Sequence, residues 1–186
     1  DDTAVINIST GDLIVLGAIN SVDADENVID INIAAARSLT ASGNVDVEGD
    51  IDGLTAGVGI LIVGNSSTTE IKEAVGATAA LAQVLVSDNT GAIFDGAVSA
   101  TLLSATGTTQ VAGNIIANVQ VLDNAFTHSV AASNKTITGT IGEASAISSV
   151  LIFVNSAGNA VIKTTVTGAV SADAVEVGTT TIGGAL

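Results

Sequence analysis

The chain has 186 residues, a formal net charge of −15 at pH 7 and 47% hydrophobic residues, almost all of them aliphatic because aromatics make up only 2%. Proline, cysteine, methionine, tryptophan and tyrosine are absent, which excludes disulfide bonds, thiol chemistry and ligand pockets lined by tyrosine or tryptophan. Lys and Arg together number 4 against 19 Asp and Glu, so we expect no nucleic-acid partner and, without a long apolar run, no membrane insertion by this segment.

Residues 2–9 form the first predicted strand, because aliphatic side chains alternate with polar ones there. We expect this strand and the final residues 181–186 to offer free sheet edges to another copy of the chain, by end-to-end stacking or by strand donation. The residues expected to mediate self-association are Val5, Ile6, Ile8, Ile182 and Leu186. Because the chain begins with Asp and contains no Met, we also expect a mature form or fragment of an exported precursor.

The first acidic segment contains Asp23, Asp25 and Asn27, whose oxygens alternate as they do at the start of a calcium loop. Val28 and Ala34 stand where an EF-hand needs Gly and Glu, so the segment is not an EF-hand. The two interpretations left open are a looser surface calcium site and a solvated acidic turn.

The second acidic segment, residues 45–52, alternates carboxylates with aliphatic side chains, which predicts a strand with an acidic outer face. The carboxylates are Asp46, Glu48, Asp50 and Asp52. Calcium that bridges to a neighbouring coil or subunit would relieve their repulsion, and calcium is the only cofactor we expect. The alternative is an acidic face that prevents edge aggregation and keeps the chain soluble.

A short unit of the form aliphatic-x-Gly-x-aliphatic recurs along the chain. Its copies are residues 15–19, 47–51, 94–98, 111–115, 137–141, 166–170 and 182–186. Their spacing predicts strands with one buried face and a bend or close backbone approach at the central Gly. Larger repeat blocks, about 75–115 and 141–186, share the pentapeptide Gly-Ala-Val-Ser-Ala, so we treat residues 1–186 as one repetitive β domain.

These features predict an all-β fold. Strands that recur at roughly 16 to 25 residues with Gly-, Asn-, Thr- and Ser-rich corners are typical of a parallel β-solenoid, and an antiparallel β-sandwich is the alternative. The Ala-rich residues 33–37 and 70–82 have helical propensity, but we expect strand or irregular structure for both.

Catalysis has little support in the sequence, and we expect no enzyme. His128 is the only histidine, and the nucleophile and phosphate-loop motifs are absent. A solenoid lyase would need basic residues, of which the chain has Arg37, Lys72, Lys135 and Lys163. Residues 118–135, which lie between the repeat blocks and break their symmetry, are where a receptor contact is expected if the chain is an adhesin.

Residues 96–115 and 168–186, each preceded by an aliphatic strand, resemble the repetitive passenger regions of large bacterial surface antigens. The resemblance is to rickettsial outer-membrane autotransporters and to solenoid proteins of S-layer type, and it covers roughly residues 43–186. It implies a cell-surface protein without catalytic residues. The sequence thus predicts an extracellular structural protein that assembles into a layer or filament, with an adhesin that binds a host or carbohydrate receptor as the alternative.

Overall fold

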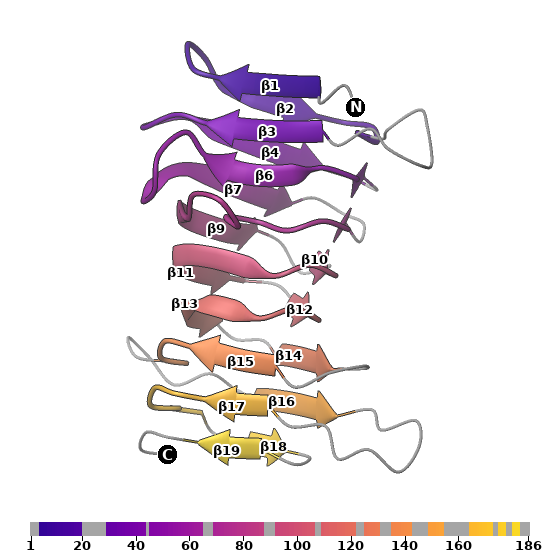
Figure 1. Cartoon of the computed structure of the whole chain (residues 1–186). Helices are drawn as coiled ribbons and strands as arrows, with labels where there is room; N and C mark the ends of the chain where they lie inside the picture. The colour runs from indigo at the N-terminus through magenta and orange to yellow at the C-terminus, as the bar shows by residue number, and fades with distance from the viewer. Residues whose placement is uncertain are drawn as a thin grey trace.

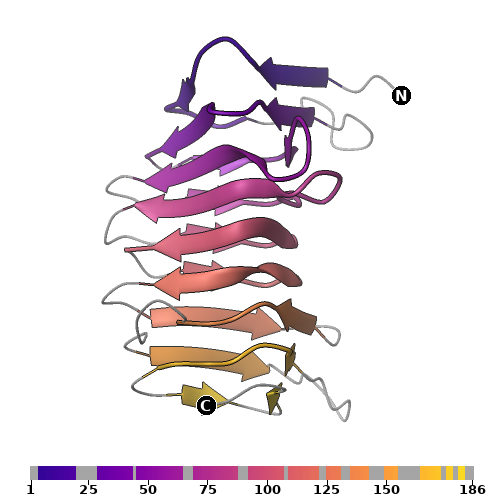
Figure 2. The ribbon, with the colours of Figure 1, turned by 90° about the vertical axis from the view of Figure 1, so that its left-hand side faces the viewer.

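A computed structural model describes residues 4–19, 29–43, 45–64, 69–87, 92–106, 109–121, 125–130, 135–142, 149–154, 164–172, 175–177 and 180–182. Within these ranges the chain contains strands and no helix, and every strand pair is parallel. Coils stack on one another from the N-terminus to the C-terminus (Figures 1 and 2). The chain is therefore a parallel β-solenoid, which confirms the predicted fold and excludes the sandwich.

Three sheets run along the stack. The longest contains β2 (Leu13–Val15), β4 (Ser38–Ser42), β7 (Val58–Gly64), β9 (Leu81–Ser87), β11 (Val98–Ala105), β13 (Ile115–Val121), β15 (Lys135–Thr138), β17 (Thr164–Val166) and β19 (Thr180–Ile182). The second contains β5 (Asp46–Val47), β8 (Thr69–Ile71), β10 (Ala92–Phe94), β12 (Thr109–Val111), β14 (Ala125–Val130), β16 (Ser149–Val154) and β18 (Val175–Val177). The third contains β1 (Ala4–Ile8), β3 (Ile29–Ile33) and β6 (Asp50–Gly53).

The strand register places equivalent residues of successive coils in columns. The first column consists of Ile6, Ile31, Ile51, Val75, Val98, Ile115, Ile137, Val166 and Ile182. The second consists of Ile19, Val47, Ile71, Phe94, Val111, His128, Ile152 and Val177. The third consists of Leu13, Leu39, Leu61, Val84, Leu103, Val119, Ile141 and Val170.

The described side chains of these columns make up most of the core. From Ile31 to Val166, every residue of the first column is 0% exposed. Parallel strands buried in this way favour β-branched aliphatic residues, which pack well on a pleated surface, and this explains the Val- and Ile-rich composition. Phe94 is also 0% exposed, between Ile71 and Val111 in the second column, so the narrow interior does accept one aromatic ring.

Glycines allow coils to approach closely at the corners. A Cβ atom built on Gly96 would lie 2.4 Å from the carbonyl oxygen of Glu73, and one on Gly113 would lie 2.2 Å from the carbonyl oxygen of Gly96. Gly139 and Gly168 meet in the same way at another corner, where a Cβ on Gly168 would lie 2.1 Å from the Gly139 oxygen. The predicted close backbone approach is thus present, and no side chain fits there without a shift of backbone.

The repeated units do not all occupy one corner. Units 47–51, 94–98 and 111–115 lead from the second column to the first, whereas units 137–141 and 166–170 lead from the first column to the third. The identical pentapeptides are likewise placed differently, because Val98 belongs to the first column and Val170 to the third. The local sequence motif therefore specifies a bend between two strands, and it does not specify which two.

The two Ala-rich segments are not helical. Residues 34–37 form the turn between β3 and β4, and residues 72–80 form an irregular connection between β8 and β9. Both observations confirm the preference for strand or irregular structure over helix.

Candidate functional site

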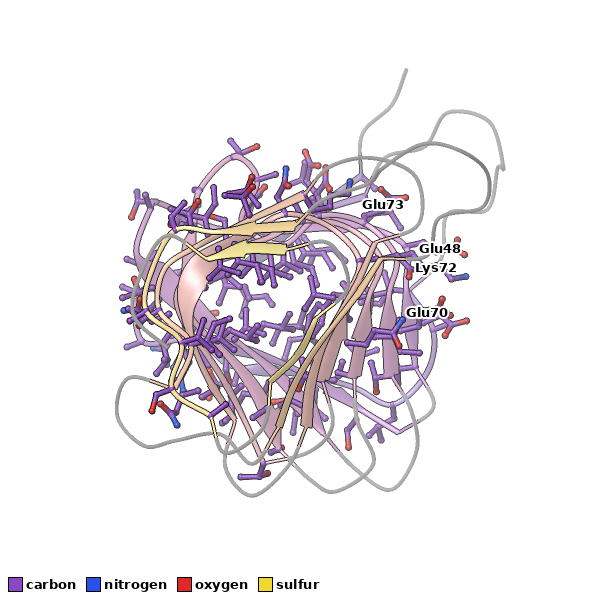
Figure 3. The ribbon with its side chains drawn as sticks, turned by 90° about the horizontal axis from the view of Figure 1, so that it is seen from below. Glu48, Glu70, Lys72 and Glu73 are labelled. Carbon is purple, nitrogen blue, oxygen red and sulfur yellow. The ribbon has the colours of Figure 1, made fainter. Side chains whose placement is uncertain are left out.

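The acidic segment 45–52 lies against the next coil and forms the main charged feature among the described residues. Its strand β5 pairs in register with β8, which places Asp46 beside Glu70. Glu48 and Lys72 directly follow these two strands, and Asp95 directly follows β10 in the coil after them. We call Asp46, Glu48, Glu70, Lys72 and Asp95 the acidic corner; Glu48, Glu70 and Lys72 lie together on the outer surface, with Glu73 nearby (Figure 3).

Lys72 is the cation at the centre of the acidic corner. Its Nζ donates a hydrogen bond of 2.8 Å to Glu48 Oε1 and lies 3.7 Å from Asp46 Oδ2. The hydrogen bond to Glu48 is the main cause that raises the pKa of Lys72, and the charges of Glu48, Asp46 and Glu70 add to it. Lys72 therefore stays protonated and offsets part of the carboxylate repulsion between two coils.

Glu70 is paired with another carboxyl group. A side-chain hydrogen bond with Asp95 raises the pKa of Glu70, with smaller contributions from desolvation and from the charges of Asp95 and Asp46, while Lys72 lowers it. A raised pKa means that the folded chain binds this proton more tightly than the unfolded chain does. This group consequently favours folding at pH values below its ordinary pKa, and that contribution is lost as the pH rises through the raised value.

Asp50 and Asp52 lie on β6 and behave differently from each other. Burial is the main cause that raises the pKa of Asp50; the nearby charges of Asp52 and Asp30 raise it further, whereas a hydrogen bond from the Ala74 amide lowers it. Asp52 is only 8% exposed, and its Oδ1 accepts hydrogen bonds from the amides of Thr78 at 3.0 Å and Ala79 at 3.1 Å. Asp52 thus organises the connection to β9 and does not share the solvated outer face that the alternation predicted.

The residues predicted to bind calcium are only partly brought together. Asp46 and Glu48 share Lys72 as their partner, and Asp50 and Asp52 make hydrogen bonds to backbone amides. Among the described residues, no group of three or more Asp, Glu or His side chains has an arrangement that could hold a metal ion. Asp23, Asp25 and Asn27 lie outside the described residues.

The residues predicted for self-association lie at the two ends of the stack. Val5 is 53% exposed, Ile6 is half-buried against the core, and Ile8 is buried at 5% exposed. Ile182 lies in β19, the last strand of its sheet, and Leu186 lies outside the described residues. β1 and β2 are the first strands of their sheets, so the N-terminal edge is formed by the segment that the sequence predicted.

The segment 118–135, where a receptor contact was expected, is largely built into the solenoid. Residues 118–121 belong to β13 and residues 125–130 to β14, while residues 122–124 and 131–134 lie outside the described part. His128 pairs in register with Val111 and Ile152, so it belongs to the second column of the fold.

Sequence reasoning missed Lys72, Glu70 and Asp95 as members of the acidic corner. Lys72 follows Glu48 by 24 residues, and the two become neighbours only through the pairing of β5 with β8. The available signal was the scarcity of cations, because a chain with 4 basic residues and 19 acidic ones has few ways to neutralise a carboxylate cluster.

Comparison with known protein families, with characterised proteins and with solved structures gives no match. In the described ranges, no helix has the length and apolar character needed to cross a membrane.

Lys72→Met is expected to lower the thermal midpoint of unfolding at low ionic strength, because it leaves Asp46, Glu48 and Glu70 together without their cation. The difference from the original chain should shrink at high salt and as the pH falls toward the raised pKa of Glu70, since both reduce repulsion. Circular dichroism melts at two salt concentrations and several pH values test this. Lys135→Met in β15 is the matched control, and an equal, salt-independent loss in both variants would contradict the prediction.

Proposed function

We propose that the chain is a non-enzymatic structural protein of the cell exterior, which assembles with copies of itself into a surface layer or filament. A cysteine-free, acidic composition suits an oxidising extracellular setting, and the resemblance to passenger regions of surface antigens supports the same location. The solenoid is compatible with this role because its sheets can be extended by further coils of the same kind.

The observation that carries the proposal is the incomplete cover over the first coil. Its inward aliphatic residues are half-buried, whereas the residues stacked directly on them in the next coil are 0% exposed. The half-buried residues are Ile6, Leu13, Val15 and Ile19, and their partners are Ile31, Leu39, Ala41 and Val47. A covering coil would remove apolar surface from water, and full burial of one such side chain contributes about 1.5 to 3 kcal/mol.

Calcium is the proposed cofactor of assembly. Copies that each carry a net charge of −15 repel one another, and a divalent cation that binds carboxylate oxygens lowers that repulsion. The acidic corner and the neighbouring pair Asp30 and Asp50 are the described places where carboxylates of adjacent coils come close.

The purified chain is expected to form large particles as its concentration rises, and to do so at lower concentration with millimolar calcium than with a chelator. Light scattering measures the onset, and electron microscopy of the same samples distinguishes layers from filaments. A chain that stays monomeric at every concentration, with and without calcium, would sink the proposal. Antibody labelling of intact source cells tests the location independently.

A further inference from the structure

We infer that copies of the chain join head to tail, with Ile182 of one copy in register with Ile6 of the next, so that the first column continues through the joint. The partner at each end is thus a second copy of this chain. This inference rests on the proposed self-assembly and specifies the interface by which it occurs.

The two ends of the first column have the same chemistry. The column starts at Ile6 in β1 and reaches Ile182 in β19, and each of its residues is Ile or Val. β1 is the first strand of its sheet and β19 the last strand of another, and both strands run in the same direction as their neighbours. A second copy placed on β1 in the same orientation therefore adds a strand of the kind the solenoid already contains.

The backbone groups of β1 show which bonds such a copy would make. The amide of Ala34 donates to the carbonyl oxygen of Ile8 at 2.9 Å, so the polar backbone groups of Ile8 point toward β3. In a parallel ladder, alternate residues direct these groups to opposite sides. Those of Val5 and Asn7 consequently point away from β3, toward the N-terminal edge of the stack.

The first column directs its backbone groups the other way, toward the following coil. The Ile51 amide donates to the Ala74 oxygen at 3.0 Å, and the Gly76 amide donates to the Ile51 oxygen at 2.7 Å. Ile182 occupies the same column, so its amide and carbonyl oxygen face the C-terminal edge. With Ile182 opposite Ile6 of the next copy, the Ile182 amide donates to the Val5 oxygen and the Asn7 amide donates to the Ile182 oxygen, which repeats the bonds around Ile51.

The joint continues the first column and leaves a step in the second. β18, which contains Val177, precedes β19, so Val177 and Ile19 of the next copy lie one coil further apart than stacked neighbours do. The joint therefore buries less surface than an internal contact between coils, and we expect it to form reversibly. Because its two faces differ, each copy leaves one of each face free, and growth gives an open, unbranched filament.

Disulfide trapping tests this register. In the cysteine-free chain, Val5→Cys combined with Thr181→Cys places the two thiols opposite each other across the proposed joint, about one strand spacing apart. Within one copy these positions lie at opposite ends of the stack, roughly 40 Å apart, so an internal disulfide cannot form. Oxidation of assembled protein is expected to give a series of covalent oligomers on a denaturing gel.

The matched control is Val5→Cys with Thr165→Cys, since Thr165 is exposed and pairs with Thr181 one coil away from the edge. This pair should stay monomeric on the gel. Val5→Cys alone that forms dimers and nothing larger would overturn the inference in favour of edge-to-edge pairing of two N-termini. Particles that form by light scattering without oligomers from the 5–181 pair would also overturn it while self-assembly stands; no particles at all would refute both.

Asn7→Pro provides a second measurement. Proline removes the Asn7 amide, which points away from β3, and is expected to raise the concentration needed for assembly by about tenfold or more while the unfolding midpoint changes little. Asn7→Ala keeps the amide and should assemble as the original chain does. Equal assembly of the two variants would overturn the proposed hydrogen bond.

Discussion

Gly113→Ala is expected to lower the free energy of unfolding by about 3 kcal/mol or more, although it adds only one methyl group. The new Cβ would lie 2.2 Å from the carbonyl oxygen of Gly96 and 2.4 Å from the amide nitrogen of Ala97. Both atoms belong to the backbone of the preceding coil, so a side-chain rotation cannot relieve the overlap. The two coils must separate at this corner, which weakens the adjacent pairing of β10 with β12.

Gly17→Ala is the matched control because Gly17 is the central glycine of another repeat unit and has no atom within 4 Å of a built Cβ. We expect its free energy of unfolding to stay within about 0.5 kcal/mol of the original chain. Urea denaturation followed by circular dichroism measures both variants. Equal losses in the two variants would show that the close approach between coils is not the cause.

Phe94→Ala is expected to lower the free energy of unfolding by about 3 to 5 kcal/mol. Phe94 is 0% exposed and is flanked in its column by Ile71 and Val111, whose backbones are held by the strand register. The columns limit how far these neighbours can move into the space left by the ring, so a cavity remains.

Two comparison variants separate the cavity from a general effect of truncation. Phe94→Leu leaves a smaller void and should cost less than Phe94→Ala. Ile116→Ala shortens a side chain that is 56% exposed and should change stability by no more than about 0.5 kcal/mol. Denaturant unfolding of the three variants gives the ranking, and a loss in Ile116→Ala as large as that in Phe94→Ala would contradict the explanation.

The fold was predictable because the signal for it is local. Alternation of aliphatic and polar residues specifies a strand with one buried face, as β3 shows with Ile29, Ile31 and Ile33 all buried. The absence of helix in the Ala-rich connection from residue 72 to 80 was also predicted. These features depend on neighbours within a few residues in the sequence.

The placement of the repeat units was not predictable, because it depends on contacts between coils. The first column is reached again after 17 residues between Val98 and Ile115 but after 29 residues between Ile137 and Val166. With such variable coil lengths, a local motif cannot reveal the column in which it starts. The identical pentapeptides at Val98 and Val170 therefore occupy different columns.

The candidate site was predictable only in part for the same reason. The sequence identified Asp46 and Glu48, but their contact with Lys72 arises from the register of β5 with β8. Asp52 illustrates the opposite case, since alternation placed its carboxylate outside. The amides of Thr78 and Ala79, which are unpaired by the irregular connection, bind it at a nearly buried position.

The unequal distances along the chain between residues of one column have a further consequence for how such a protein can change. The chain leaves a column and returns to it in register whether 16 residues intervene, as between Val166 and Ile182, or 29, as between Ile137 and Val166. An insertion in a corner connection can therefore be accommodated without altering a buried residue, at a loop-closure cost that grows only slowly with length. Descendants of one ancestral solenoid could thus carry different surface segments on an unchanged scaffold.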